Sequence, residues 1–392
     1  MSEMFFYDYA WLCQHQAQHT ASEIWQQPDL WQTLGDELIT HKPDWFTFLA
    51  PILAQADLRI ILSGAGSSAF VGRALAPWLR EKIDRDVIAW GTTDIVAAPM
   101  QYLSASRPTL LVSFARSGDS PESLSSVQLA DQLLPQCYHL IITCNPHSQL
   151  AQYAQDNPRA CRMIMPEGSH DQSFAMTSSF SCMLLSAALM LAGETLPDWR
   201  HALQRMTDCC RQLRETLSPQ SKKIASSAFQ RYLVLGSGPF AGIAEEAALK
   251  MLELTAGKDM TRFDTPLGVR HGPKFMIDGQ TLLVMMFSPD AYTRRYERDL
   301  WRELQHNNRA LQLVGLSHHQ HGMTDTLALH DDHEALWMIF PYLLFLQMLA
   351  FERSLHHQLS PDNPSPNGEV NRVVQGVVIY PFHGSGVSNV QG

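Results

Sequence analysis

Residues 109–114 read Thr109-Leu110-Leu111-Val112-Ser113-Phe114, and residues 117–122 read Ser117-Gly118-Asp119-Ser120-Pro121-Glu122. The apolar run is typical of a strand buried in a parallel sheet, and Ser120 with Pro121 predicts the start of a helix directly after the turn. Free backbone N–H groups and the helix dipole at such a turn favour an anion. The serine hydroxyls add donors without adding charge. We therefore expect this turn to bind the phosphate group of a small metabolite, and we do not expect the ligand to be a polymer.

The composition limits the classes of protein to which the chain can belong. Its 392 residues are enough for two domains, and 45% hydrophobic with 17% charged residues describes a well-packed globular protein. The formal net charge of −10 argues against non-specific binding of nucleic acid, which needs a basic face. It does not argue against a small anionic ligand, because local donors decide that.

Cysteine usage and hydropathy favour a cytoplasmic protein. The seven cysteines are an odd number without a C-x-x-C pair, as expected for reduced thiols packed in a core. The N-terminus shows no signal peptide. The most apolar stretch, residues 336–351, falls short of the roughly 20 residues of a membrane span. It predicts a buried helix, either in the core or at a subunit interface.

Three strand-like runs recur at a constant offset of 172 residues and indicate an internal duplication. They pair Arg59–Gly66 with Arg231–Gly238, Thr109–Val112 with Thr281–Val284, and Leu140–Ile142 with Gln312–Val314. Because strands alternate with helix-length segments, the fold class is α/β, with two tandem doubly wound, flavodoxin-like parallel-sheet domains. At the same offset Arg116-Ser117-Gly118 becomes Ser288-Pro289-Asp290, so we expect no phosphate at the second copy of the turn.

The chain divides into four predicted regions. They are a helical extension over residues 1–45, a first domain with the phosphate cradle over 46–217, a second domain with the catalytic groups over 218–360, and a tail over 361–392. The start of the tail is rich in proline and glycine, which could indicate a frayed terminus. The apolar run 373–380 that follows favours a tail that folds back over the site.

A second turn, Gly64-Ala65-Gly66-Ser67-Ser68, follows the first predicted strand. It lacks the third glycine of a dinucleotide-binding fingerprint, and by itself it could be only a tight turn. Gly66 would allow close backbone approach, while Ser67 and Ser68 offer hydroxyls. Ligands bind at the carboxyl ends of parallel strands, so this turn and the Ser117 turn predict one sugar-phosphate cradle.

The catalytic candidates lie in the second half. Residues 245–254 form a strong helix in which Lys250 and Glu253 share a face. This face could be solvated and laced with ion pairs, or Glu253 could be a carboxylate base for proton transfer beside a carbonyl or imine. His271 lies in a turn and could be a surface residue or the group that opens a sugar ring. His318-His319-Gln320-His321 is interpreted as a solvated loop, and no metal is assigned.

Taken together, these motifs resemble the tandem sugar isomerase (SIS) domain family over nearly the whole chain. The matching signatures are the turns at 64–68 and 117–122, with Phe174–Ser178, Ala248–Leu254 and Arg270–Pro273. The resemblance implies that Ser67, Ser68, Ser117, Ser120 and the backbone around Arg116 and Gly118 hold the phosphate, and that Thr177 lies in a segment that lines the sugar site. It also implies that Glu253 shuttles a proton between C2 and C1, with Lys250 orienting the open-chain sugar. His271 would open the ring from a neighbouring subunit, which makes a homodimer necessary.

Two positions depart from the amination branch of this family. Ala115 stands in place of a phosphate-binding serine, and Asn371 or Arg372 stands where that branch has a tail lysine. Arg372 could contact the substrate, but its guanidinium cannot donate a proton or form an imine. The chain opens Met1-Ser2 and has no glutaminase domain, so ammonia release is the expected direction.

The resemblance therefore implies a homodimeric deaminase and isomerase that converts galactosamine 6-phosphate to tagatose 6-phosphate and ammonia without metal or organic cofactor. Aldose–ketose isomerisation without loss of nitrogen stays open, as does a sugar-phosphate sensor without turnover. The joint presence of Glu253 and His271 favours an enzyme. A transcription regulator is disfavoured, because the first 45 residues contain no basic recognition helix.

Overall fold

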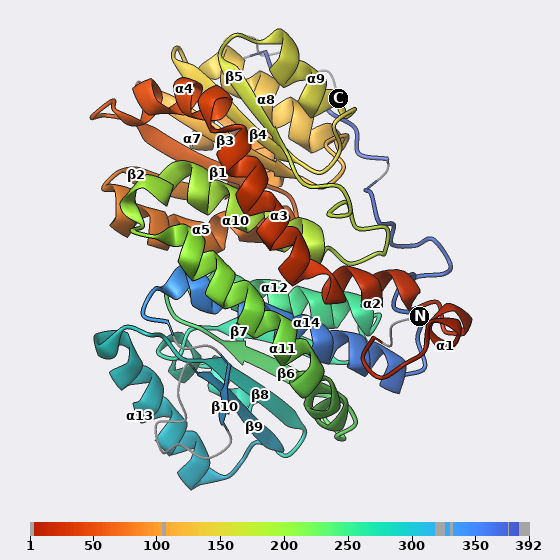
Figure 1. The fold of residues 1–392 in the computed structure, drawn as a ribbon. Coiled ribbons are helices and arrows are strands. Elements are labelled where there is room, and N and C mark those ends of the chain that lie inside the picture. The colour runs from red at the N-terminus through yellow and green to blue at the C-terminus, as the bar shows by residue number, and fades with distance from the viewer. Residues whose placement is uncertain (1–3, 104–106, 318–325, 330–331, 375, 384–392) are drawn as a thin grey trace.

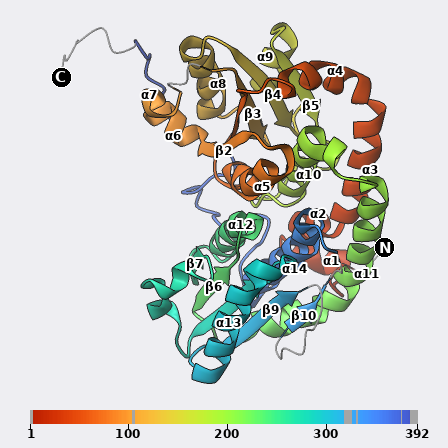
Figure 2. The same cartoon turned by 90° about the vertical axis from the view of Figure 1, so that its left-hand side faces the viewer.

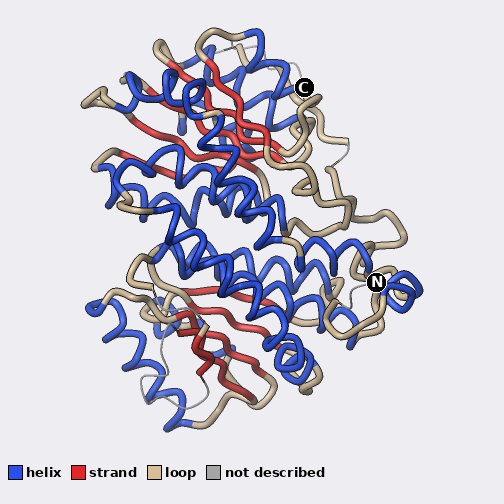
Figure 3. The backbone as a smooth tube through the Cα atoms, in the orientation of Figure 1, coloured by secondary structure: helices blue, strands red, loops and turns tan. Residues whose placement is uncertain are grey.

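The protein is described by a computed structural model that covers residues 4–103, 107–317, 326–329, 332–374 and 376–383. The histidines at 318, 319 and 321 lie outside these residues. Two α/β halves are stacked with a layer of helices between their sheets (Figure 1). Figure 3 shows the strands in two separate groups, one above and one below this layer.

The first half contains a five-stranded parallel sheet in the order β2-β1-β3-β4-β5. Its strands are β1 (Arg59–Gly64), β2 (Asp86–Gly91), β3 (Thr109–Ala115), β4 (Cys137–Thr143) and β5 (Ala160–Ile164). Every residue of β3 is buried, and β3 lies at the centre of the sheet. The buried parallel strand predicted for residues 109–114 is confirmed.

The second half contains another five-stranded parallel sheet, in the order β7-β6-β8-β9-β10. Its strands are β6 (Arg231–Leu235), β7 (Met260–Asp264), β8 (Thr281–Met286), β9 (Gln312–Ser317) and β10 (Thr326–Ala328). The strand order matches that of the first sheet, and the three sequence runs at the 172-residue offset lie in β1 and β6, β3 and β8, and β4 and β9. The predicted fold class is confirmed.

Helices precede and cover the sheets. The extension contains α1 (Tyr9–Gln14), α2 (Gln18–Trp25), α3 (Gln27–Thr40) and α4 (Lys42–Leu53). The first half adds α5 (Ser67–Ile83), α6 (Thr92–Ala97), α7 (Pro99–Tyr102), α8 (Pro121–Leu133), α9 (Gln149–Asp156), α10 (Ser178–Ala192) and the 3-10 helix η1 (Gly193–Thr195). The second half adds α11 (Trp199–Ala225), α12 (Pro239–Leu254), α13 (Ala291–Asn307), α14 (Ala335–His356) and the 3-10 helices η2 (Gly268–Arg270) and η3 (Pro273–Met276).

Two of the predicted region boundaries fall inside helices. The boundary after residue 45 lies within α4, and the one after residue 217 lies within α11. The helix α11 runs on for 27 residues because its apolar face packs against both α3 and α14. The two halves are therefore joined by one continuous helix and not by a flexible linker.

Two helices are long and apolar enough to cross a membrane by length and composition alone, namely residues 178–195 and α14. Both are buried inside the protein, with 94% of the apolar window of α14 buried. The helix α14 packs against α11 and α12 of its own chain. The buried helix predicted for residues 336–351 is thus a core helix, and its burial needs no partner subunit.

The halves meet most closely where α5 crosses α12 (Figure 2). A Cβ atom on Gly242 would lie 2.3 Å from the backbone nitrogen of Ala74 and 2.6 Å from its Cα. Beside this crossing, Arg73 of α5 forms an ion pair with Glu245 of α12. Only a glycine lets the two backbones approach this far.

We predict that Gly242→Ala lowers the free energy of unfolding by about 2 kcal/mol or more, because the clash is with backbone atoms that cannot rotate away. Urea unfolding monitored by tryptophan fluorescence measures the change. Gly279→Ala is the matched control, because its added Cβ would meet no atom within 4 Å. Equal losses in the two variants would contradict the close helix approach.

Candidate functional site

The turn after β3 is fixed by local hydrogen bonds and one glycine. The Ser120 hydroxyl accepts a hydrogen bond from the backbone N–H of Ser123 at 3.3 Å, which confirms the predicted helix cap. Gly118 has a φ of 67°, and a Cβ there would lie 2.4 Å from Ser148 Oγ. The Asn145 amide donates to the Ser117 carbonyl at 3.0 Å. The turn is thus rigid before any ligand arrives.

Both glycines of the turn after β1 are required. At Gly64 a Cβ would lie 2.5 Å from the carbonyl carbon of Ser68. Gly66 has a φ of 53°, which favours glycine, and no protein atom lies within 4 Å of an added Cβ there. Ser67 and Ser68 then begin α5 and are buried.

The two turns line one cavity of about 110 Å³. Its walls include Ser68, Ala115, Arg116, Ser117, Ser120, Ser123, Met176 and tail residues 372–374. Sites for small ligands are typically about 300–1,000 Å³, so this cavity can hold only the phosphate end of a sugar phosphate while the tail lies over it. Ser123 and Met176 are lining residues that the sequence analysis did not single out.

The Arg116 guanidinium supplies a positive charge to this cavity. It is buried and donates to the carbonyls of Phe174 at 3.1 Å, Ser173 at 3.4 Å and Arg372 at 2.7 Å. Burial lowers its pKa, against the raising effects of the Asp171 and Glu253 carboxylates. Carbonyls do not neutralise a charge, and within the described chain no carboxylate lies at ion-pair distance from Arg116. This charge favours an anionic ligand.

Thr177 follows Met176, which lines the cavity, but is not itself part of the cavity lining. The buried Asp171 carboxylate accepts the backbone N–H groups of Thr177, Ser178 and Ser179 at 2.9 to 3.0 Å, and the Thr177 hydroxyl at 3.1 Å. The Thr177 hydroxyl thus donates to Asp171, whose carboxylate caps the start of α10, and the neighbouring Met176 lines the cavity. Sequence reasoning missed Asp171, which organises this segment.

The acidic face of α12 is buried, so the solvated-face alternative is wrong. Lys250 is 1% exposed and lies between Glu253, with which it forms an ion pair, and Glu246, at 3.6 Å. Burial raises the pKa of Glu246 to about 8, although Lys250 and the nearby Ser67 act in the opposite direction. Burial lowers the pKa of Lys250, but the two carboxylates raise it further, so Lys250 stays protonated.

The buried face of α12 lies close to the residues of the small cavity. The Glu253 carboxylate acts electrostatically on Arg116, and Ser67 at the start of α5 lies against Glu246. The Glu253 side chain retains 23% of its exposure, so a ligand can reach it. The serine-rich turn of the first half and the carboxylate and lysine of the second half are therefore close enough for Glu253 to act electrostatically on Arg116.

The structure brings Arg372 to this site but not His271. The Arg372 carbonyl accepts from Arg116, and its guanidinium donates to the backbone carbonyl of Asp171. His271 follows η2 on the surface of the second half. Within the described residues, no hydrogen bond or ion pair joins it to Glu253 or to the cavity.

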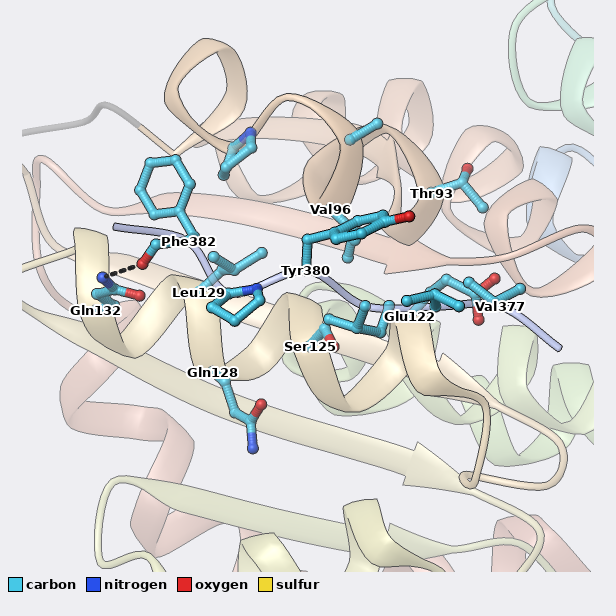
Figure 4. A pocket seen from close by; sticks show the side chains of 15 residues that line it. Thr93, Val96, Glu122, Ser125, Gln128, Leu129, Gln132, Val377, Tyr380 and Phe382 are labelled. Atoms are coloured by element: carbon cyan, nitrogen blue, oxygen red, sulfur yellow. Dashed lines mark hydrogen bonds between the residues drawn. The ribbon is translucent and has the colours of Figure 1, made fainter. Parts of the chain in front are cut away.

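A larger cavity, of about 760 Å³, lies between α6, α7 and α8 and is crossed by residues 377–382 of the tail (Figure 4). Tyr380 extends over this groove beside Thr93 and Val96, and the Gln132 amide donates to the Phe382 carbonyl at 3.2 Å. Of Glu246, Lys250 and Glu253 on α12, none lines this groove. The groove thus holds the tail and not the reacting groups.

No group of three His, Cys, Asp or Glu side chains is placed to hold a metal ion in the part of the chain that the structure describes. The donors that converge on the phosphate cavity are hydroxyls, backbone N–H groups and one guanidinium. They suit a phosphate and not a cation.

The fold and the site define a sugar-phosphate protein of the SIS type. The SIS domain profile matches residues 52–192, and the chain belongs to this family. It is 42% identical to the D-galactosamine-6-phosphate deaminase AgaS of Shewanella sp. strain ANA-3, over 95% of this chain and 94% of that protein. It is 40% identical to the AgaS deaminase of Escherichia coli, over 93% and 96% of the two chains.

Solved structures agree with this assignment. A protein of Clostridium novyi assigned as a tagatose-6-phosphate ketose/aldose isomerase aligns with a TM-score of 0.93 and 39% identity, over 97% of this chain and all of that one. The tagatose-6-phosphate ketose/aldose isomerase of Escherichia coli aligns with a TM-score of 0.86 and 38% identity, over 93% and 96%. The chain is therefore an enzyme of this family.

We predict that Glu246→Gln changes the pH dependence of stability. Because the folded-state pKa of Glu246 lies near 8 and its ordinary value is 4.5, the stability that its protonated form contributes is present below about pH 4.5 and lost as the pH rises to 8. The free energy of unfolding of the wild type, relative to the variant, should fall by about 2 kcal/mol or more over this interval. Urea titrations from pH 5 to 9 measure it.

Glu245→Gln is the control for this experiment, because it removes a carboxylate from the same helix outside the Lys250 cluster. It should follow the wild-type profile. Parallel profiles for the wild type and Glu246→Gln would show that Glu246 is not held in a protonation-sensitive environment.

Proposed function

We propose that this protein converts D-galactosamine 6-phosphate and water to D-tagatose 6-phosphate and ammonia. The observation that carries the proposal is the ion pair of Glu253 with Lys250, close enough for Glu253 to act electrostatically on the buried Arg116, which lines a phosphate-sized cavity. The names of the deaminase relatives, at 40 to 42% identity over almost their whole length, support the same substrate.

The phosphate of the substrate would occupy the cavity between the two turns. Ser68, Ser117 and Ser120 offer hydroxyl donors there, the turn around Gly118 offers backbone N–H groups, and Arg116 offers charge. Hydrogen bonds to an ionised phosphate are the stronger class, and these turns are fixed in advance. The phosphate would therefore anchor the substrate with its carbon chain directed toward α12.

The proposed chemistry needs one carboxylate. In the open-chain aldose, Glu253 takes the proton from C2, and the electrons form the C1–C2 double bond while the aldehyde oxygen is protonated. Glu253 returns the proton to C1, which leaves an imine at C2. Water adds at C2, the C–N bond breaks, and ammonia leaves the ketose. Lys250, held beside Glu253, would stabilise negative charge on the sugar oxygens.

Ring opening would use His271 of a second copy of the chain, which makes the enzyme a homodimer in the cytoplasm. Support comes from the edge strand β7 and the surfaces beside it, which expose large apolar side chains at Leu252, Met260, Phe263, Leu267 and Phe275, the last 90% exposed. Apolar surface of this extent is typical of an interface. A second copy seated there would cover these side chains.

We expect the purified enzyme to release ammonia from galactosamine 6-phosphate, and Glu253→Gln to reduce the rate by at least about 1,000-fold, because the amide cannot accept the C2 proton. A coupled glutamate dehydrogenase assay measures ammonia, with glucosamine 6-phosphate as the epimer for comparison. Glu245→Gln should retain activity. No ammonia from either substrate would refute the deaminase.

The same samples test isomerisation without deamination. The names of the structural relatives indicate tagatose 6-phosphate as the substrate to use. Incubation of tagatose 6-phosphate with the enzyme, followed by chromatography of the sugar phosphates, would show an aldose product if this activity is present. Aldose formation without any ammonia from the amino sugar would make the protein an isomerase and not a deaminase.

We also expect complementation between two inactive variants. A mixture of refolded Glu253→Gln and His271→Ala chains should recover about a quarter of the wild-type rate, because half of the dimers are mixed and each mixed dimer has one complete site. Each variant alone should stay inactive. A mixture as inactive as its components would show that His271 acts within its own chain.

A further inference from the structure

The helix α2 lies outside residues 52–192, which match the SIS domain, yet it reaches the site. Its Glu23 is 5% exposed, and the Glu23 carboxylate accepts the backbone N–H groups of Gln172 and Ser173 and the Ser173 hydroxyl. All three donors belong to the segment of residues 165–177 between β5 and α10, here called the β5–α10 loop. One side chain of the extension thus fixes this loop.

The β5–α10 loop in turn fixes Arg116. The carbonyls of Ser173 and Phe174 accept from the Arg116 guanidinium, so the residue that Glu23 binds through its N–H and hydroxyl also binds Arg116 through its carbonyl. A guanidinium has five N–H donors in a rigid plane, and fixing one edge of the plane fixes the direction of the rest. Glu23 and the Arg116 guanidinium are thus linked through a single residue, Ser173, which forms hydrogen bonds with both.

The same helix also holds the tail that covers the cavity. The Asp362 carboxylate accepts from the Thr20 backbone N–H and hydroxyl, both at 2.7 Å, and its carbonyl accepts from the Phe174 N–H at 3.1 Å. Further along the tail, the Arg372 carbonyl is the third acceptor of Arg116. Helix α2 therefore holds both the loop and the tail in place, and Arg116 donates hydrogen bonds to both.

We propose that Glu23 is a positioning residue for the phosphate site: it holds the β5–α10 loop so that the Ser173 and Phe174 carbonyls aim the Arg116 guanidinium at the phosphate of the substrate. The inference rests on the proposed function, because it takes the cavity at Arg116 to be the phosphate site. The helical extension would then contribute to substrate affinity but not to proton transfer, since Glu23 contacts none of Glu246, Lys250 and Glu253 within the described residues.

Glutamine is the informative replacement for Glu23. It keeps the size of the side chain and one carbonyl oxygen, but its amide nitrogen cannot accept from the N–H or hydroxyl of Ser173. The fold should tolerate it, because no charge is left unpaired. Ser173→Ala removes only the hydroxyl donor and is a second, milder test.

Inorganic phosphate is the probe for binding, and galactosamine 6-phosphate is the probe for turnover. For Glu23→Gln we expect the phosphate concentration that half-saturates the rise in melting temperature to increase about tenfold, and KM to rise about as much, with kcat within about twofold of the wild type. Ser173→Ala should shift both in the same direction, and the double variant should add little to Glu23→Gln.

Glu352→Gln is the matched control. Glu352 is another buried carboxylate, 3% exposed, which accepts from the Tyr7 hydroxyl at 3.0 Å and contacts no part of the β5–α10 loop in the described structure. Its variant should change melting temperature without changing phosphate affinity. A purely structural role for Glu23 would give the same pattern for Glu23→Gln and would overturn the proposal, as would a fall in kcat at constant KM.

The outcomes separate this inference from the proposed function. If the wild type binds phosphate but releases no ammonia, the proposed reaction fails, and phosphate affinity still tests Glu23. If Glu23→Gln does not fold, Ser173→Ala supplies the answer, because unchanged phosphate affinity in that variant contradicts the path through Ser173. A wild type that gains no stability from phosphate overturns the inference directly.

Discussion

The crossing of α5 and α12 at Gly242 is the constraint on which the rest of the site depends. The phosphate-binding turns belong to the first sheet, whereas Glu246, Lys250 and Glu253 belong to a helix of the second. Only because the helix backbones touch at Ala74 does the start of α5, with Ser67, lie against the acidic face of α12. The proposed site takes groups from both halves, so the proposed reaction would depend on the close contact between them.

This arrangement buries more charge than folding alone would favour. Arg116 and Lys250 are each less than 10% exposed, and removing such charged groups from water costs several kcal/mol each unless they are paired. Lys250 forms an ion pair with Glu253, whereas Arg116 donates its hydrogen bonds to backbone carbonyls within the described residues. A phosphate in the cavity would complete the pairing of Arg116. Stability is thus lower in the empty protein at the place where an anionic substrate restores it.

How much of the site can be predicted from the sequence depends on how local each interaction is. The strand at 109–114, the Ser120 cap and the two turns were predictable because neighbouring residues determine them. The burial of Lys250 was not, because the spacing of charges on α12 cannot reveal that α5 covers them. Glu23 and its partner Ser173 lie 150 positions apart, so no local pattern links them, and none shows that the Thr177 hydroxyl donates to Asp171.

The two sheets share a strand order, but the residues at the second turn differ from those at the first. At the 172-residue offset Pro289 replaces Ser117, which removes both a hydroxyl and a backbone N–H donor. The helix α13 is then capped by the Asp290 carboxylate, which accepts from the Thr293 N–H at 2.6 Å, whereas α8 is capped by the neutral Ser120. A carboxylate at that helix end already satisfies the dipole and repels a phosphate. The second half would then contribute no phosphate turn to the proposed site, but the charged groups of α12, the helix that follows β6.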